Sequence, residues 1–174
     1  RSNLTILSHG GGVLQIGEFG ASLGATRPSP TAGWNNGHDE GETPMRVHHI
    51  QLMMPTDGQD RARAFWCETM GLTEVPKPVA LSVRGGCWFR AFDENGATVV
   101  EMHISPDEGF APARRSHPAF VLDSVAELEQ LAARVEAGGY ELSWADRDTF
   151  DGYLRFHCWD GFGNRVEVLT TLAG

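Results

Sequence analysis

Residues 160–169 read D-G-F-G-N-R-V-E-V-L, a glycine-rich turn followed by a stretch that alternates in polarity. Such alternation predicts a β-strand with one buried face. Val166 and Val168 suit that buried face, which leaves Glu167 on the opposite one. Fifty residues before this glutamate, His117 opens another short apolar stretch, H-P-A-F-V-L.

The same pairing of a histidine with a later glutamate occurs once more, nearer the N-terminus. His49 lies in H-H-I-Q-L-M-M and Glu101 in V-V-E-M-H-I, and 52 residues separate them, against 50 for His117 and Glu167. Two nearly equal spacings in similar surroundings indicate an internal duplication.

Secondary-structure signals around these residues repeat in one order. In the first copy we expect a strand over 46–54, a helix capped by Asp57 or Asp60 and running to about Met70, and three strands near 79–84, 86–92 and 97–104. In the second copy we expect a strand over 117–122, a helix over 125–137 and strands near 140–145, 153–159 and 164–170. The prediction is an α+β fold built from tandem βαβββ modules.

The patterned region defines the domain that we expect. It covers 45–174, with modules at 45–104 and 117–172 joined by a linker at 105–116. Residues 1–44 are rich in Gly, Ser, Thr, Asn and Pro, so we predict a low-complexity, mostly disordered N-terminal extension there.

Strand alternation places four candidate metal ligands, His49, Glu101, His117 and Glu167, on the sheet faces turned away from the helices. Two imidazoles and two carboxylates form a ligand set for one divalent metal ion, which Zn, Ni, Co, Mn and Fe(II) all fit. His103 shares a face with Glu101 and is a rival ligand. For any one of these residues, a solvated position at a sheet rim is the alternative interpretation.

Composition excludes several partners. The formal net charge of −9 argues against a general nucleic-acid binder, and no apolar run is long enough to suggest a membrane helix. We therefore expect a small-molecule substrate. Three cysteines without C-x-x-C spacing suit reduced, buried thiols, and we expect a cytoplasmic location.

Candidate substrate-binding residues lie on the strands that precede the two glutamates. Arg90 shares a face with Trp88, and His157 shares a face with Trp159. These side chains suit an anionic or aromatic group of a substrate. Ordinary polar residues on a surface strand are the alternative.

At these residues the chain resembles the vicinal oxygen chelate superfamily, which includes glyoxalase I, bleomycin-resistance and fosfomycin-resistance proteins and extradiol dioxygenases. The resemblance covers about 45–172. It is carried by V-H-H-I-Q-L, by F-W-C-E-T-M-G-L and by the closing D-G-F-G-N-R-V-E-V-L, which is similar to the family's D-P-x-G-N-x-x-E signature with Phe162 in place of proline.

The resemblance implies curled mixed sheets around a metal cleft, with family ligand positions at His49, Glu101, His117 and Glu167. It implies a metal-dependent lyase or isomerase of the glyoxalase type that chelates a small hydroxycarbonyl compound and reacts through an enediolate, with Glu167 or Glu101 as general base. The alternatives are an Fe(II) extradiol-type dioxygenase and a metal-free binding or resistance protein. Relatives form the cleft within one chain or across a module-exchanged homodimer, and both remain open.

Overall fold

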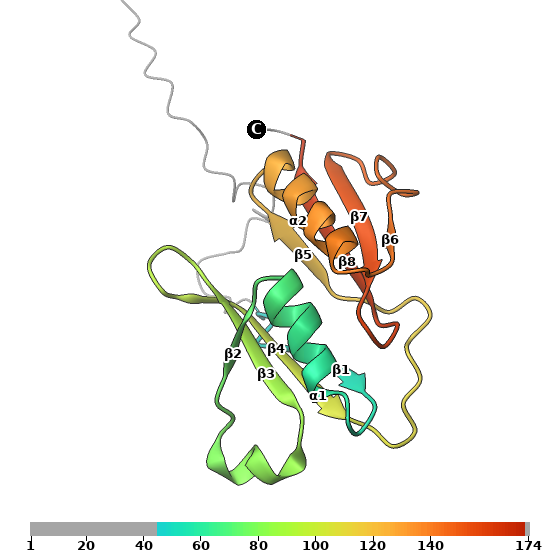
Figure 1. Ribbon diagram of the computed structural model, residues 1–174. Coiled ribbons are helices and arrows are strands. Elements are labelled where there is room, and N and C mark those ends of the chain that lie inside the picture. The colour runs from blue at the N-terminus through green and yellow to red at the C-terminus, as the bar shows by residue number, and fades with distance from the viewer. Residues whose placement is uncertain (1–44, 173–174) are drawn as a thin grey trace, which may run out of the picture. The chain divides into compact units, whose positions relative to one another are not determined.

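The computed structural model describes residues 45–172. The predicted N-terminal extension and the last two residues lie outside the described range. The described chain forms two modules, each with a four-stranded mixed sheet and a helix, which confirms the predicted α+β fold (Figure 1).

The sheet of the first module has the strand order β1-β4-β3-β2. The edge strand β1 pairs in parallel with β4, and the other neighbours are antiparallel. The strands span Ile50–Met54 (β1), Thr73–Val75 (β2), Cys87–Phe92 (β3) and Thr98–Pro106 (β4).

The second sheet repeats this arrangement in the order β5-β8-β7-β6, again with a parallel pair at one edge. Its strands span Ala119–Leu122 (β5), Leu142–Ser143 (β6), Tyr153–Trp159 (β7) and Arg165–Thr171 (β8). The matching topology is the structural counterpart of the duplicated spacing in the sequence.

Helix α2 (Val125–Ala137) lies across the second sheet (Figure 1). Its N-cap is Ser124, whose hydroxyl accepts a hydrogen bond from the backbone N–H of Glu127. A stripe at helical spacing is buried against the sheet: Leu128, Leu131, Ala132 and Val135. Each of these two buried leucines contributes about 2 kcal/mol of hydrophobic stabilisation.

The helix of the first module differs from the sequence prediction at its start. Helix α1 (Gln59–Arg63) has Gly58 at the N-cap, with no side-chain cap, so neither Asp57 nor Asp60 caps it. Asp60 instead binds Arg63 within the helix. The chain continues as a π-helical segment, η2 (Ala64–Thr69), which buries Phe65, Trp66 and Thr69.

Residues 79–84 form a 3₁₀ helix, η3 (Val79–Arg84), so the strand predicted there is wrong. Prolines at 76 and 78 precede the segment, and the N–H of Leu81 closes a turn onto the carbonyl of Pro78. The edge strand beside β3 is β2 instead. Gly86, at φ +81°, begins the return into β3, where a Cβ would lie 2.3 Å from the carbonyl oxygen of Ile104.

One hydrophobic core joins the two modules. Phe65 packs edge-on against Tyr140, and Trp66 packs against Phe120 of β5. Arg134 of α2 donates from Nε to the carbonyl of Thr69 at 3.2 Å.

Within residues 45–172 no helix is long and apolar enough to cross a membrane. The three cysteines form no disulfide bond; Cys87 and Cys158 are buried and Cys67 is half-buried.

Candidate metal centre

The second sheet places Glu167 and His157 on neighbouring strands. They are cross-strand partners in the register of β8 and β7. His117 lies just before β5, and the N–H of Glu167 donates to the carbonyl of Pro118 at 3.0 Å, which brings this histidine beside the glutamate. Three residues far apart in sequence therefore meet on one sheet face.

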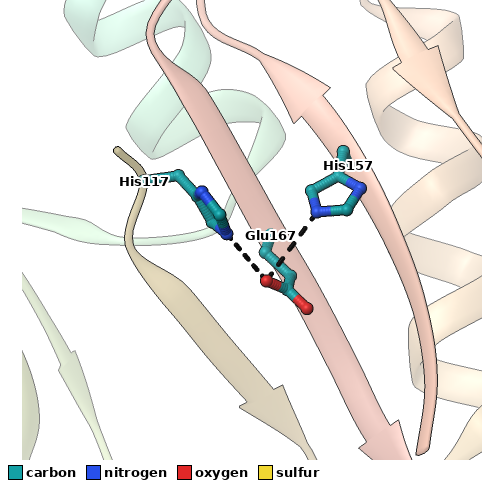
Figure 2. Close-up of side chains that lie close together, drawn as sticks. All are labelled: His117, His157 and Glu167. Carbon is teal, nitrogen blue, oxygen red and sulfur yellow. Dashed lines mark hydrogen bonds and ion pairs between the residues drawn. The ribbon is translucent and has the colours of Figure 1, made fainter. Parts of the chain in front are cut away.

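Figure 2 shows the two imidazoles on either side of one carboxylate oxygen. The distance from Glu167 Oε2 to Nε2 of His117 is 2.8 Å, and to Nε2 of His157 it is 3.7 Å. Ligand atoms of all three residues lie within 4.8 Å of one another. His117, His157 and Glu167 thus form a candidate metal site, which we call the second-sheet cluster.

Arg155 holds the other oxygen of the glutamate. Its Nη1 donates to Glu167 Oε1 at 2.9 Å, while the Glu167 side chain is only 8% exposed. Burial by itself raises the pKa of this carboxyl, but the hydrogen bond and positive charge of Arg155, together with the contact with His117, outweigh it and the pKa is lowered. Glu167 is therefore an ionised carboxylate at neutral pH.

His157 is almost fully buried and its Nε2 has no hydrogen-bond partner among the described residues. Its Nδ1 lies 3.6 Å from Asp146 Oδ2. Burial lowers the pKa of His157, and the positive charge of Arg165 lowers it further. The imidazole is therefore neutral at pH 7, which leaves a ring nitrogen able to bind a metal.

His117 is oriented from its other ring nitrogen. Nδ1 lies 2.6 Å from the backbone carbonyl of Arg115, the arrangement in which Nδ1–H donates. Metal-binding histidines are commonly oriented by such a hydrogen bond, because it fixes the lone pair on Nε2. That lone pair faces Glu167 Oε2, so a proton or a metal ion between these groups would be stabilised by both.

The first sheet carries a corresponding first-sheet cluster around Glu101. Arg90, its cross-strand partner, donates from Nε to Oε2, and His103 Nε2 lies 3.0 Å from Oε1. Burial by itself raises the pKa of Glu101, but these two partners lower it overall. Each module thus holds one buried glutamate between an arginine and a histidine.

Aromatic stacking fixes His103 within the first-sheet cluster. Its ring stacks on Trp88 at 3.8 Å between centroids and on His49 at 4.4 Å. His49 itself is exposed and also contacts the exposed His48, with 3.0 Å between their Nδ1 atoms.

The structure brings the four predicted metal ligands together in pairs. His117 and Glu167 meet in the second-sheet cluster, joined by His157, for which the sequence predicts a role in substrate binding. His49 and Glu101 lie in the first-sheet cluster, where both contact His103 and neither belongs to the three-residue metal group found within 45–172.

The expected substrate-binding residues also divide between the two clusters. Trp88 and Arg90 belong to the first-sheet cluster. Trp159 is half-buried opposite Arg165 at the end of β7.

Arg155 is the residue that the sequence reasoning missed. The signal was present in R-F-H-C-W, because Arg155 and His157 are two residues apart on β7 and so share a face.

Two cavities adjoin the clusters. One of about 550 Å³ is lined by Arg46, Arg90 and Glu101, together with neighbouring residues. A second of about 420 Å³ is lined by His117, by Gln51 and other β1 residues, and by the linker. Both volumes are of the size that holds small molecules.

Residues 46–168 match the family model described as the Glyoxalase/Bleomycin resistance protein/Dioxygenase superfamily. The match spans both modules and ends just after Glu167. The chain belongs to this superfamily, as the residue patterns indicated.

The chain is also similar to solved structures. A glyoxalase family protein from Bacillus anthracis is 33% identical, with a TM-score of 0.64, over 75% of this chain and 98% of that one. The fosfomycin resistance protein FosX from Listeria monocytogenes is 17% identical, with a TM-score of 0.57, over 75% of this chain and 97% of that one. A mutant of FosX was solved with Mn(II) and 1S,2S-dihydroxypropylphosphonic acid. No curated protein matches the chain.

Proposed function

We propose that this protein is a divalent-metal-dependent enzyme of the glyoxalase type, which isomerises or cleaves a small hydroxycarbonyl compound. The observation that carries the proposal is the second-sheet cluster, in which two imidazoles flank one oxygen of a buried, ionised glutamate. The 33% identical glyoxalase family protein supports the reaction class.

The second-sheet cluster fits a metal ion in two respects. Nε2 of the buried His157 lacks a partner in the described chain, and an unpaired buried polar atom is costly unless something binds it. His117 is oriented through Nδ1, which leaves Nε2 for a metal. A divalent ion bound there would act as a Lewis acid toward two substrate oxygens.

Glu167 and Glu101 are the proposed proton acceptors. Both are ionised, but the guanidiniums of Arg155 and Arg90 also make them weak bases. An anionic substrate group that draws one of these arginines away would raise the basicity of the released glutamate. Substrate binding and proton abstraction would thereby be coupled.

The cavity beside the first-sheet cluster suggests where such an anionic group binds. Arg46 and Arg90 both line it, and Arg90 already contacts Glu101. Trp88 offers an aromatic surface nearby through its stack with His103. We therefore propose a substrate that combines a hydroxycarbonyl unit with a carboxylate or similar anion, and Trp159 as a contact from the second sheet.

We further propose that the four predicted ligands His49, Glu101, His117 and Glu167 come together, beside His157, between two copies of the chain. His49 is exposed, and β1 and β5 are edge strands of their sheets. A two-fold dimer that sets the first-sheet cluster of one copy against the second-sheet cluster of the other would join the pairs.

The test incubates the purified chain with Ni, Zn, Mn or Fe(II). The substrate is the hemithioacetal that a 2-oxoaldehyde forms with a thiol. The variant Glu167→Gln is compared with Glu136→Gln, a charge-matched control exposed on α2. We expect metal retention and oxygen-independent isomerisation in the wild type and the control, and loss of both in Glu167→Gln.

Two results contradict the proposal. A chain that retains none of the four metals, with Glu167→Gln indistinguishable from wild type, would be a metal-free binding protein. Oxygen consumption on catechols with Fe(II) alone would instead assign an extradiol-type dioxygenase.

A further inference from the structure

A third cavity, of about 480 Å³, is lined by none of the residues of the two clusters. Val100 and Val168 line it, and they directly adjoin Glu101 and Glu167 in β4 and β8. Because successive side chains of a strand point to opposite faces, these two valines point away from the clusters, and no residue of the candidate metal centre lines the cavity.

Both modules contribute to the cavity, and its wall is mainly apolar. The apolar residues include Trp66, Leu72, Val100, Phe120, Leu131 and Val168. Phe92, Val99 and Val121 also line it and are 44%, 61% and 64% exposed, so the apolar surface continues to the mouth. A mostly apolar cavity of this volume is typical of a small-molecule site.

Trp66, one of the residues that line the cavity, has an unused hydrogen-bond donor. The residue is fully buried, and its Nε1 has no partner among the described residues. Buried indole N–H groups normally find an acceptor. A ligand with a carbonyl or ether oxygen would provide one.

The charged residues of the cavity are all acidic: Asp93, Asp123 and Glu127. Asp93 is used within its own turn, where it accepts from the N–H groups of Asn95 and Ala97. The carboxylates of Asp123 and Glu127 make no hydrogen bond or ion pair within residues 45–172, and no Lys, Arg or His of that range lines the cavity. The charge favours a cation.

We propose that this cavity binds an apolar small molecule that carries a protonated amine and a hydrogen-bond acceptor. The apolar body lies against the wall between the modules, the acceptor receives the Trp66 N–H, and the ammonium group lies near Asp123 and Glu127. The site is independent of the proposed reaction.

The first experiment compares three probes of similar length on the wild-type chain by titration calorimetry. Aminopropyl benzamide has both polar groups, butyl benzamide lacks the charge, and phenylpentylamine lacks the acceptor. We expect aminopropyl benzamide to bind about three- to five-fold more tightly than either analogue, as suits one exposed charge or one hydrogen bond. Addition of Mn(II) or a chelator leaves this affinity unchanged, because no residue of the candidate metal centre lines the cavity.

Variants then assign the two contacts. The double change Asp123→Asn with Glu127→Gln removes the preference for aminopropyl over butyl benzamide, whereas Glu136→Gln, on α2 but outside the cavity, preserves it. Trp66→Phe removes the preference for aminopropyl benzamide over phenylpentylamine.

Equal affinities of the wild type for all three probes would overturn the proposal, whatever the folding of the Trp66 variant. The proposal would also be overturned if no probe bound and Val121→Ser converted the protein from a dimer to a monomer. In that case a second copy of the chain would be the occupant of the cavity.

Discussion

The side-chain amide of Asn164 donates to the backbone carbonyl of Met53 at 2.9 Å, across 111 residues of sequence. The same amide binds Asp160, which also accepts the N–H groups of Phe162 and Asn164. Gly163, at φ +89°, lets the turn close. The D-G-F-G-N turn therefore fixes the start of β8 against β1 of the other module.

Removal of this amide destabilises the fold. Asn164 is buried, so Asn164→Ala leaves the Met53 carbonyl and one oxygen of Asp160 without a partner, and we expect a loss of about 1–3 kcal/mol in the free energy of unfolding. Urea denaturation measures it. Asn95→Ala is the control, because only the backbone N–H of this exposed residue is bonded. Equal midpoints for both variants would contradict the assigned role.

His157→Gln tests whether the third member of the second-sheet cluster contacts the metal. We expect the affinity for Mn(II) to fall at least about tenfold, since a neutral imidazole nitrogen is lost from the site. Metal titration by calorimetry measures the change, and Glu136→Gln serves as an exposed control outside both clusters. An unchanged affinity would return His157 to the role of a substrate contact.

Mixing His49→Ala with His117→Ala tests the shared site. Each variant alone should lose tight metal binding, because each lacks one proposed ligand at every site. If two copies share a site, random mixed dimers restore about a quarter of the wild-type metal sites. Metal analysis after joint unfolding and refolding measures this fraction. If the mixture binds no more metal than the two variants alone, the complete site lies within one chain.

The buried thiol of Cys158 should lower the free energy of unfolding at alkaline pH. Burial raises the pKa of its thiol from 9.0 to about 12. Between these values the unfolded chain releases the proton while the folded chain keeps it, so stability is present below pH 9 and is lost as pH rises. Relative to Cys158→Ala, the wild type should lose up to about 1.4 kcal/mol per pH unit over this window. Denaturation at stepped pH measures the slope.

Cys67→Ala is the matched control for that slope, since Cys67 is only half-buried. Parallel pH profiles for the wild type and Cys158→Ala would show that the buried thiol does not govern the loss.

Local sequence was sufficient for several elements. Ser124, the apolar stripe from Leu128 to Val135, and Gly138 define α2 without reference to the rest of the chain, and the helix has the predicted bounds. Strand β7 also has its predicted bounds. Strand parity likewise placed Val166 and Val168 in the core and Glu167 on the other face.

Where two local structures had similar propensity, the rest of the fold determined which of them formed. Val79–Arg84 has the composition of a strand, but two prolines before it and Gly85-Gly86 after it shape a 3₁₀ turn, and the sheet takes Thr73–Val75 as its edge. Gly58 rather than an aspartate starts α1, where a Cβ would lie 2.9 Å from the ring of Phe162.

The sequence alone determined the duplicated modules and the sheet faces of Glu101 and Glu167, because strand parity and helical periodicity are properties of neighbouring residues. Only the tertiary structure decided which of these side chains meet. The cross-strand register sets His157 against Glu167 and Arg90 against Glu101, and the packing between modules leaves His49 apart from the second-sheet cluster. Register and packing depend on contacts 50 or more residues apart, such as that of His117 with Glu167, which no local pattern specifies.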